Sequence, residues 1–211
     1  MPWVVDYSRS TFKSELMDLY LIRNARFFIG TTSGLTNVAI SFGISCALVN
    51  CITSDAQPWS SDVRFALKPV LALDGPLNQR QMSTAPWCWR LFDAAVIQRH
   101  GGPAMDNSSD KILETVKEVD ALVEERSEFY EARYDAAELM SLWRQQLVVD
   151  HYYGAARPSL YCLDRHKSEF LQGEEEERWL LKRTPSRSSL AYGPAHQASC
   201  QAWTIRTFHS Q

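Results

Sequence analysis

The chain begins with three short apolar runs separated by two segments of helical spacing. The runs lie at residues 3–5, 26–29 and 46–49, and each predicts a buried strand. After the first run, a helix is expected to begin at Ser10 or Thr11. It would turn inward a stripe of apolar side chains: Phe12, Leu16, Met17, Tyr20 and Leu21. After the second run, Gly43 is expected to end a shorter helix with an apolar stripe of its own: Leu35, Val38, Ala39 and Phe42.

Strands that are apolar throughout and alternate with helices are typical of a parallel sheet covered on both faces. The crossovers between such strands are almost always right-handed, which leaves one sensible topology. Residues 2–50 are therefore predicted to form a compact βαβαβ unit. The fold class that follows is α/β, with a Rossmann-like parallel sheet followed by helices.

The pattern is weaker after residue 50. Residues 53–103 are expected to be irregular, apart from a short strand at 70–73 and a helix at 89–97. A long helix is predicted from Asn107 or Ser108 to about Glu125, and another at 135–147 with Leu139, Leu142, Trp143 and Leu147 facing inward.

This pattern divides the chain into three parts. Residues 1–150 are predicted to form a Rossmann-like domain, and residues 151–185 a helical extension. Residues 186–211 are rich in Ser, Pro, Gly and charge, and we expect a poorly ordered tail there.

Composition excludes several classes of protein. The 22 Lys and Arg residues against 25 Asp and Glu give a net charge of −3, and the basic residues are scattered, so nucleic acid is not an expected partner. The five cysteines form no CxxC or Cys/His cluster, which predicts buried free thiols and no metal site. The chain shows neither a signal peptide nor an apolar run long enough for a transmembrane segment. A cytoplasmic location is expected, with attachment to a membrane surface left open.

The segment with most chemical content is Gly30-Thr31-Thr32-Ser33-Gly34, between a predicted strand and a predicted helix. Ligands of open parallel sheets bind beyond the carboxyl ends of the strands, and a helix N-terminus there offers unpaired amides to a phosphate. The alternative is that Gly30 supplies only a positive φ and that a Thr or Ser only caps the helix. The segment matches neither a dinucleotide fingerprint nor a P-loop, and its glycines lie at the wrong offsets for a hydrolase elbow.

Four stretches of the first 50 residues closely resemble a bacterial GT-B-like glycosyltransferase family associated with surface-polysaccharide biosynthesis. They are Val5-Asp6-Tyr7-Ser8, Lys13-Ser14-x-x-Met17-Asp18, residues 26–35 from Arg26 to Leu35, and Phe42-Gly43-Ile44. A later stretch, Asp106-Asn107-Ser108-Ser109-x-x-Ile112, looks like a helix start of the same family. The resemblance is dense over residues 4–50, thin over 51–125 and weak beyond.

The resemblance implies a nucleotide-diphosphate sugar as donor and a glycan or lipid-linked acceptor, with no cofactor and no metal. It places the donor diphosphate against Gly30, Thr31, Thr32, Ser33 and Gly34. Lys13 would neutralise the diphosphate, or else is a solvated lysine on a helix face. Asp6, Ser10 and Asn50 would line the cleft, although a cap or turn role for Asp6 stays open. The catalytic residue is not identified.

The chain departs from the family in one respect. GT-B enzymes place the acceptor site, and usually the catalytic base, in an amino-terminal Rossmann domain, whereas this chain begins almost directly on a predicted strand. The expectation is therefore the carboxy-terminal, donor-binding half of a transferase. The alternative is a non-catalytic remnant or a nucleotide-binding module that keeps the fold without turnover.

Overall fold

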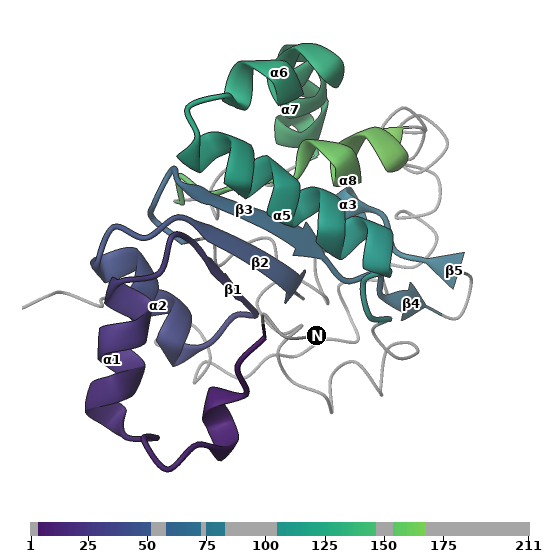
Figure 1. Ribbon diagram of the computed structural model, residues 1–211. Helices are drawn as coiled ribbons and strands as arrows, with labels where there is room; N and C mark the ends of the chain where they lie inside the picture. Colours follow the sequence, from purple (N-terminus) through teal and green to yellow (C-terminus); the bar gives the residue numbers. More distant parts are fainter. Residues whose placement is uncertain (1–3, 52–57, 73–74, 83–104, 147–153, 168–211) are drawn as a thin grey trace, which may run out of the picture. The chain divides into compact units, whose positions relative to one another are not determined.

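The computed structural model describes residues 4–51, 58–72, 75–82, 105–146 and 154–167, all within one unit that spans residues 1–171 (Figure 1). The elements follow one another as a 3-10 helix η1 (Tyr7–Arg9), α1 (Glu15–Arg23), β1 (Phe28–Gly30), α2 (Gly34–Ser41), β2 (Cys46–Cys51), β3 (Val63–Leu67), β4 (Leu71–Ala72), β5 (Gly75–Pro76), α3 (Gln79–Met82), α5 (Ser109–Val123), α6 (Ser127–Arg133), α7 (Ala136–Gln145), β6 (Arg157–Pro158) and α8 (Leu160–Arg165). Among these helices, none combines the length and the apolar character that crossing a bilayer requires.

Four parallel strands form the main sheet, in the order β1-β2-β3-β6. Gly30 lies opposite Leu48, and Leu48 lies opposite Phe65, so the three longer strands end at a common edge. Parallel neighbours need a crossover, and α2 provides it between β1 and β2. The α/β class with a Rossmann-like parallel sheet is confirmed. A separate pair, β4 and β5, is antiparallel.

Alternation along β3 sends neighbouring side chains to opposite faces of the sheet. Phe65 points to a core cluster shared with α2 and α7, and its ring meets that of Trp143 edge to face at a centroid distance of 6.1 Å. Arg64 points to the other face, where it pairs with Glu118 of α5. Figure 1 shows α5 lying across β2 and β3. The sheet is therefore covered on both faces, as continuous apolar strands require.

The strand predicted at residues 3–5 is wrong in the part that the structure describes. Val4 and Val5 adopt no strand and are 71% and 83% exposed. A strand needs a neighbouring backbone as well as apolar side chains, and in the described residues β1 pairs with β2 alone. The predicted βαβαβ unit lacks its first strand, and β1 lies at an edge of the described sheet.

The first helix begins later than predicted and faces differently. Its N-cap is Ser14, whose hydroxyl accepts a hydrogen bond from the Met17 amide at 3.2 Å. The Tyr7 hydroxyl bonds both to the N–H and to the C=O of Ser14, at 3.0 and 3.1 Å, and so holds the preceding residues in a loop. Most of the predicted inward stripe is exposed, namely Phe12, Leu16, Tyr20 and Leu21, and Ile22 is the buried residue of α1.

The shorter helix α2 ends as predicted. Gly43 has a φ of +73° and donates its amide to the Ile40 carbonyl, while the Ile44 amide reaches the Ala39 carbonyl at 3.0 Å. This pair of bonds is the Schellman arrangement of helix C-termini. Leu35, expected to face inward, is exposed.

Two strands of the main sheet were missed. β3 lies within the segment 53–103, which was expected to be irregular, and β6 lies at Arg157–Pro158, where a helical extension was expected. Helix α8 lies within that predicted extension. The sequence of β3, Val-Arg-Phe-Ala-Leu, places an arginine among the four buried residues that begin the strand and so breaks the apolar pattern. By contrast, the short strand at 70–73 is confirmed at Leu71–Ala72.

The two later helices are confirmed. α5 begins after the N-cap Ser108, and α7 turns Leu139 and Trp143 inward. Of the predicted free cysteines, Cys46, Cys51 and Cys162 are free and buried. Cys88, Cys200, the helix predicted at 89–97 and the tail after residue 186 lie outside the described residues, and the proposed division into three parts stays a prediction.

Candidate functional site

The polar turn predicted after β1 exists and lies at the carboxyl edge of the sheet. Residues 31–33 follow β1, and Asn50 and Lys68 lie at the ends of β2 and β3. Since Gly30, Leu48 and Phe65 are in register, these segments line one edge. This is the edge at which open parallel sheets bind their ligands.

A buried hydroxyl that the sequence did not single out holds the turn in place. Thr36, in the first turn of α2, is 2% exposed and donates its hydroxyl to the Thr31 carbonyl at 2.6 Å. Its oxygen also lies 3.4 Å from the Ser33 hydroxyl. Thr31, Thr32, Ser33 and Gly34 themselves are exposed. The buried Thr36 side chain thus holds the turn, while the residues of the turn remain exposed.

The N-terminus of α2 is not capped by a side chain. Ser33 occupies the N-cap position with extended backbone, yet its hydroxyl bonds to no amide of the helix. In α1, α5 and α7 the cap residues Ser14, Ser108 and Asp135 do accept such a bond. The alternative in which a Ser or Thr of this turn caps the helix therefore does not hold for Ser33. Among the described residues, no side chain caps the first amides of α2.

The two glycines of the turn differ in role. Neither lies in the left-handed region, so Gly30 is not there to supply a positive φ. A Cβ on Gly30 would meet the Phe28 ring at 2.5 Å, so a larger residue at the end of β1 would require that ring to move. Within the described part of the chain, a Cβ on Gly34 would meet nothing within 4 Å. No described side chain therefore crowds the backbone where α2 begins.

Asn50, a predicted cleft residue, is tied into the protein. It has a φ of +56°, and the pairing of β2 with β3 shifts its register between Leu48 and Cys51. Asn50 and Asn107 each donate the backbone N–H to the other's side-chain oxygen, at 2.6 Å in both directions. Asn107 Nδ2 also donates to the Leu67 carbonyl at 2.9 Å. Asn107 thus joins the ends of β2 and β3 to the start of α5.

One of the turn's hydroxyls interacts with a thiol. The Thr32 hydroxyl lies 3.7 Å from Cys51 Sγ. Burial raises the pKa of the Cys51 thiol to about 11, and the Thr32 contact lowers it by less. Because the thiolate is the nucleophilic form, Cys51 is unsuited to nucleophilic chemistry near neutral pH.

A lysine that sequence reasoning missed lies at the same edge. Lys68 follows β3, its side chain is 19% exposed, and Nζ lies 2.6 Å from Asp106 Oδ1. The Asp106 side chain is itself mostly exposed, at 78%. In the sequence, Lys68 can be recognised as an edge residue only if Val63–Leu67 is first assigned as a strand, because its position directly after that strand is the signal.

The remaining predicted residues come from the segment before α1. Asp6 accepts a hydrogen bond from the Ser8 hydroxyl at 2.5 Å, which is the local turn role. Lys13 is exposed, and its backbone N–H bonds to the Ser10 carbonyl at 3.3 Å. The Ser10 hydroxyl is buried, and it has no hydrogen-bond partner among the residues that the structure describes. Within the described part of the chain, no hydrogen bond or ion pair joins Asp6, Ser10 or Lys13 to the turn after β1.

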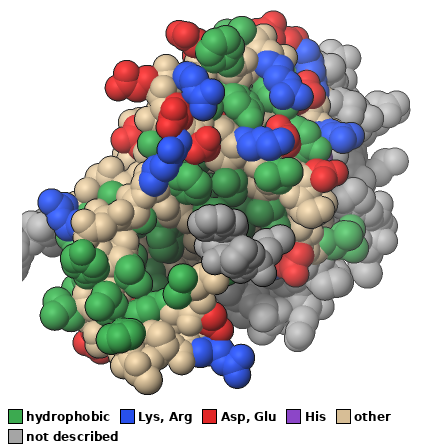
Figure 2. All heavy atoms as spheres, in the orientation of Figure 1, with side chains coloured by type: hydrophobic (Ala, Val, Ile, Leu, Met, Phe, Trp, Pro, Cys, Tyr) green, Lys and Arg blue, Asp and Glu red, His purple; other side chains and the backbone are tan. Residues whose placement is uncertain are grey.

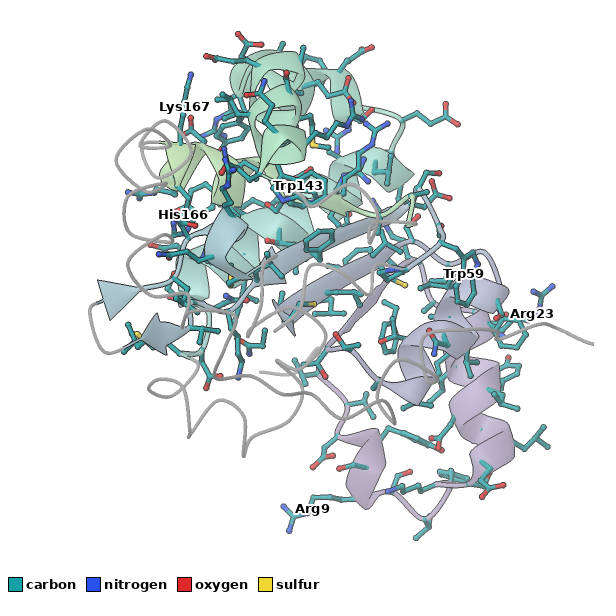
Figure 3. The ribbon with its side chains drawn as sticks, turned by 180° about the vertical axis from the view of Figure 1, so that it is seen from behind. Arg9, Arg23, Trp59, Trp143, His166 and Lys167 are labelled. Carbon is teal, nitrogen blue, oxygen red and sulfur yellow. The ribbon has the colours of Figure 1, made fainter. Side chains whose placement is uncertain are left out.

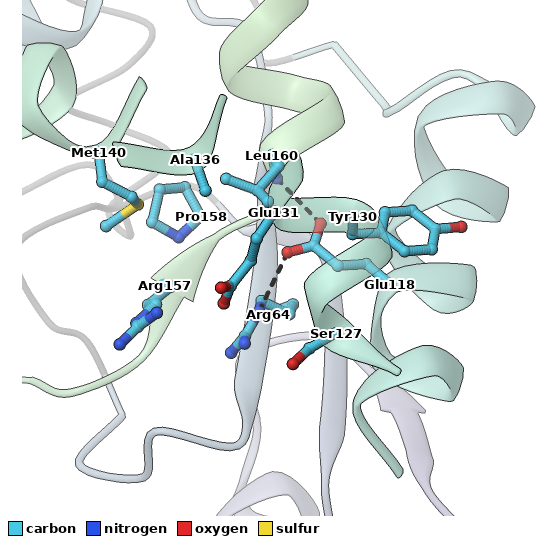
Figure 4. A pocket seen from close by; sticks show the side chains of 10 residues that line it. All are labelled: Arg64, Glu118, Ser127, Tyr130, Glu131, Ala136, Met140, Arg157, Pro158 and Leu160. Atoms are coloured by element: carbon cyan, nitrogen blue, oxygen red, sulfur yellow. Dashed lines mark hydrogen bonds and ion pairs between the residues drawn. The ribbon is translucent and has the colours of Figure 1, made fainter. Parts of the chain in front are cut away.

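A second feature is a shallow hollow between β3, β6, α5, α6 and α7 (Figure 4). Arg64 and Glu118 form its floor, with Arg64 Nε 3.0 Å from Glu118 Oε1. Glu118 Oε2 accepts the amide of Leu160, the first residue of α8, at 2.9 Å. Burial raises the pKa of the Glu118 carboxyl, and Arg64 and the hydrogen bonds lower it by less. The pair joins α5, β3 and α8, which is a structural role.

Comparisons of the chain with protein-family models, with curated proteins and with solved structures found no match.

Proposed function

We propose that the carboxyl edge of the sheet binds the diphosphate of a nucleotide-sugar donor, and that the chain is the donor-binding half of a glycosyltransferase. The observation that carries the proposal is the start of α2. An exposed hydroxyl turn precedes a helix whose N-terminus lacks a side-chain cap, and no described residue would crowd a Cβ at Gly34. An anion is the ligand that such a helix end favours.

In this proposal the diphosphate accepts hydrogen bonds from the first amides of α2 and from the hydroxyls of Thr31 and Ser33. Lys68, held near the edge by Asp106, adds positive charge, and Lys13 is a further candidate. Donors fixed before the reaction stabilise the charge that develops on a departing diphosphate. In this proposal these residues stabilise the departing diphosphate. No side chain is assigned to proton transfer.

A second candidate is a nucleotide-binding module without catalytic activity. The observation that favours it is that polar side chains at this edge bind one another: Asn50 pairs with Asn107, and Lys68 pairs with Asp106. These pairs stabilise the fold of the edge, so in this candidate only the turn after β1 binds the nucleotide. Both candidates require diphosphate binding, and they differ in sugar transfer.

Titration calorimetry with UDP-, GDP- and ADP-sugars tests the proposal, with inorganic diphosphate as a minimal probe. At least one donor should bind, and Ser33→Tyr should abolish its binding by filling the space above the turn. Ser141→Tyr, at an exposed position of α7, is the matched control and should bind normally. Absence of binding by all four probes, or equal binding by the Ser33 variant, would refute the site.

A further inference from the structure

Helix α1 carries more apolar surface than the described fold covers. Six of its nine residues are apolar, and one of them, Ile22, is buried. Leu16, Leu19 and Tyr20 are 78%, 41% and 62% exposed, and Phe12, just before the helix, is 74% exposed. Figure 2 shows hydrophobic side chains gathered over α1. A helix that is apolar on several sides is normally buried on several sides.

The exposed residues are arranged as one helical stripe. Leu16, Leu19 and Tyr20 are three and four positions apart, so they share a face of α1. We refer to these three residues as the α1 stripe. Phe12 precedes it, and Arg23 extends it by one turn. Figure 3 shows Arg23 projecting outward at the far end of α1, where its guanidinium lies 5.4 Å from the centre of the Phe42 ring. An apolar stripe of this kind is a docking surface for another helix.

The charged residues of α1 indicate which helix would pack against the α1 stripe. Glu15 begins the helix and Arg23 ends it, and each is four residues from Leu19. If a second α1 packs antiparallel across a twofold axis at Leu19, Glu15 of each copy meets Arg23 of the other. The α1 stripe together with Glu15 and Arg23 is therefore complementary to itself, as an isologous interface requires. Antiparallel packing also brings opposite ends of the two helix dipoles together.

The same charges argue against a lipid surface as the occupant. Glu15 and Asp18 balance Lys13 and Arg23 along this segment. Amphipathic helices that lie on anionic membranes carry an excess of Lys and Arg on the polar face. A balanced set gives no net attraction to such a membrane, whereas it does suit a second copy.

We propose that this protein forms a twofold homodimer through antiparallel packing of α1 against α1 of a second copy. The proposal is independent of the nucleotide site, because it uses none of the residues of the turn after β1. Sedimentation velocity and light scattering on the full 211-residue chain should find a species of twice the mass of one chain, in equilibrium with monomer. Leu16→Glu combined with Tyr20→Glu should give monomer at all concentrations. Phe129→Glu, at a residue 67% exposed on α6, is the matched control and should leave the dimer intact.

Charge reversal gives the sharper test. Glu15→Arg and Arg23→Glu should each weaken the dimer by about tenfold, since the twofold axis doubles each lost pair. Together they recreate complementary pairs with the signs exchanged and should return the dissociation constant to within about threefold of the original. Circular dichroism on every variant verifies that α1 still forms.

Several results would overturn the proposal. A chain that remains monomeric at the highest concentration it tolerates would do so. A dimer that survives the Leu16/Tyr20 variant, or that Phe129→Glu disrupts, would place the interface elsewhere. A monomer that sediments with phosphatidylcholine–phosphatidylserine vesicles, and loses this behaviour in the Leu16/Tyr20 variant, would assign the stripe to a membrane.

Discussion

Asn50 and Asn107, 57 residues apart in the sequence, hold each other's backbone amides through their side-chain oxygens at 2.6 Å. Asn50 occupies the left-handed region at a register shift of β2, a conformation that Asn tolerates better than most residues. Asn107 also donates to the Leu67 carbonyl. The pair therefore fixes the edge of the sheet beside the proposed donor site, and backbone strain of this kind gathers at functional edges.

Asn107→Ala should destabilise the protein by about 3 kcal/mol, because it leaves the Asn50 amide and the Leu67 carbonyl without their partners in a buried region. Urea unfolding followed by circular dichroism measures the change. A loss below about 0.5 kcal/mol would mean that water replaces Asn107 at little cost.

Substitutions at Asn50 separate backbone strain from hydrogen bonding. Asn50→Gly removes the side-chain oxygen that Asn107 uses but relaxes the positive φ, whereas Asn50→Ala removes the oxygen and keeps the strain. The alanine variant should be less stable than the glycine variant by about 1 kcal/mol in the same unfolding experiment. Equal stabilities would indicate that the backbone here relaxes after substitution.

The Schellman turn at Gly43 makes a second prediction about backbone. A Cβ on Gly43 would meet no described residue within 4 Å, so the expected cost of Gly43→Ala comes from its φ of +73°. The expected loss is about 1 kcal/mol. Thermal unfolding measures it, and Gly43→Asn should recover part of it, since Asn is the usual substitute for Gly at this position.

Gly34→Ala should separate stability from ligand binding. Its backbone is not left-handed and its Cβ would be unobstructed, so the fold should be unchanged or stabilised by about 0.5 kcal/mol. If the diphosphate packs against this backbone, the added methyl group should weaken nucleotide binding at least tenfold in calorimetry. Unchanged affinity in a stable variant would place the phosphates away from α2.

Sequence patterns predicted the elements whose signals are local. The Schellman turn needed only Gly43 after an apolar helix stripe, and α5 needed only Ser108 before one. β3 was missed because its signal is not local: Arg64 breaks the apolar run, and only the distant Glu118 makes a buried arginine tolerable. The strand predicted at residues 3–5 failed for the opposite reason, since its apolar side chains have no neighbouring strand in the described sheet.

The candidate site likewise contains residues that local sequence predicts and residues whose roles depend on distant contacts. The hydroxyl turn after β1 could be predicted, because strand, glycine and helix follow one another along the chain. Thr36, Lys68 and Asn107 could not, because their roles depend on contacts across the sheet edge. Nothing in the order of residues shows that Thr36 would bond to the turn and leave Ser33 without a capping role.

The buried pair of Arg64 and Glu118 predicts how the protein responds when one partner is removed. Arg64→Met leaves the buried Glu118 carboxylate without its counter-ion, so it should destabilise the protein by about 3 kcal/mol near neutral pH. Combining it with Glu118→Gln, which removes the unpaired charge but keeps an oxygen for the Leu160 amide, should recover much of this loss. Urea unfolding of both variants measures the difference.

The same carboxyl predicts a dependence on pH with a definite sign. Burial raises the pKa of Glu118 above its ordinary value of 4.5, so between these two values the folded state binds more protons than the unfolded state. Its contribution to the free energy of unfolding is thus fully present below pH 4.5 and is lost as the pH rises through the raised pKa. Glu118→Gln binds no proton there, so the stability of the natural protein minus that of the variant should fall as the pH rises across this window. Unfolding curves at several pH values would show it, and a difference that instead grows with pH would mean that Arg64 outweighs burial.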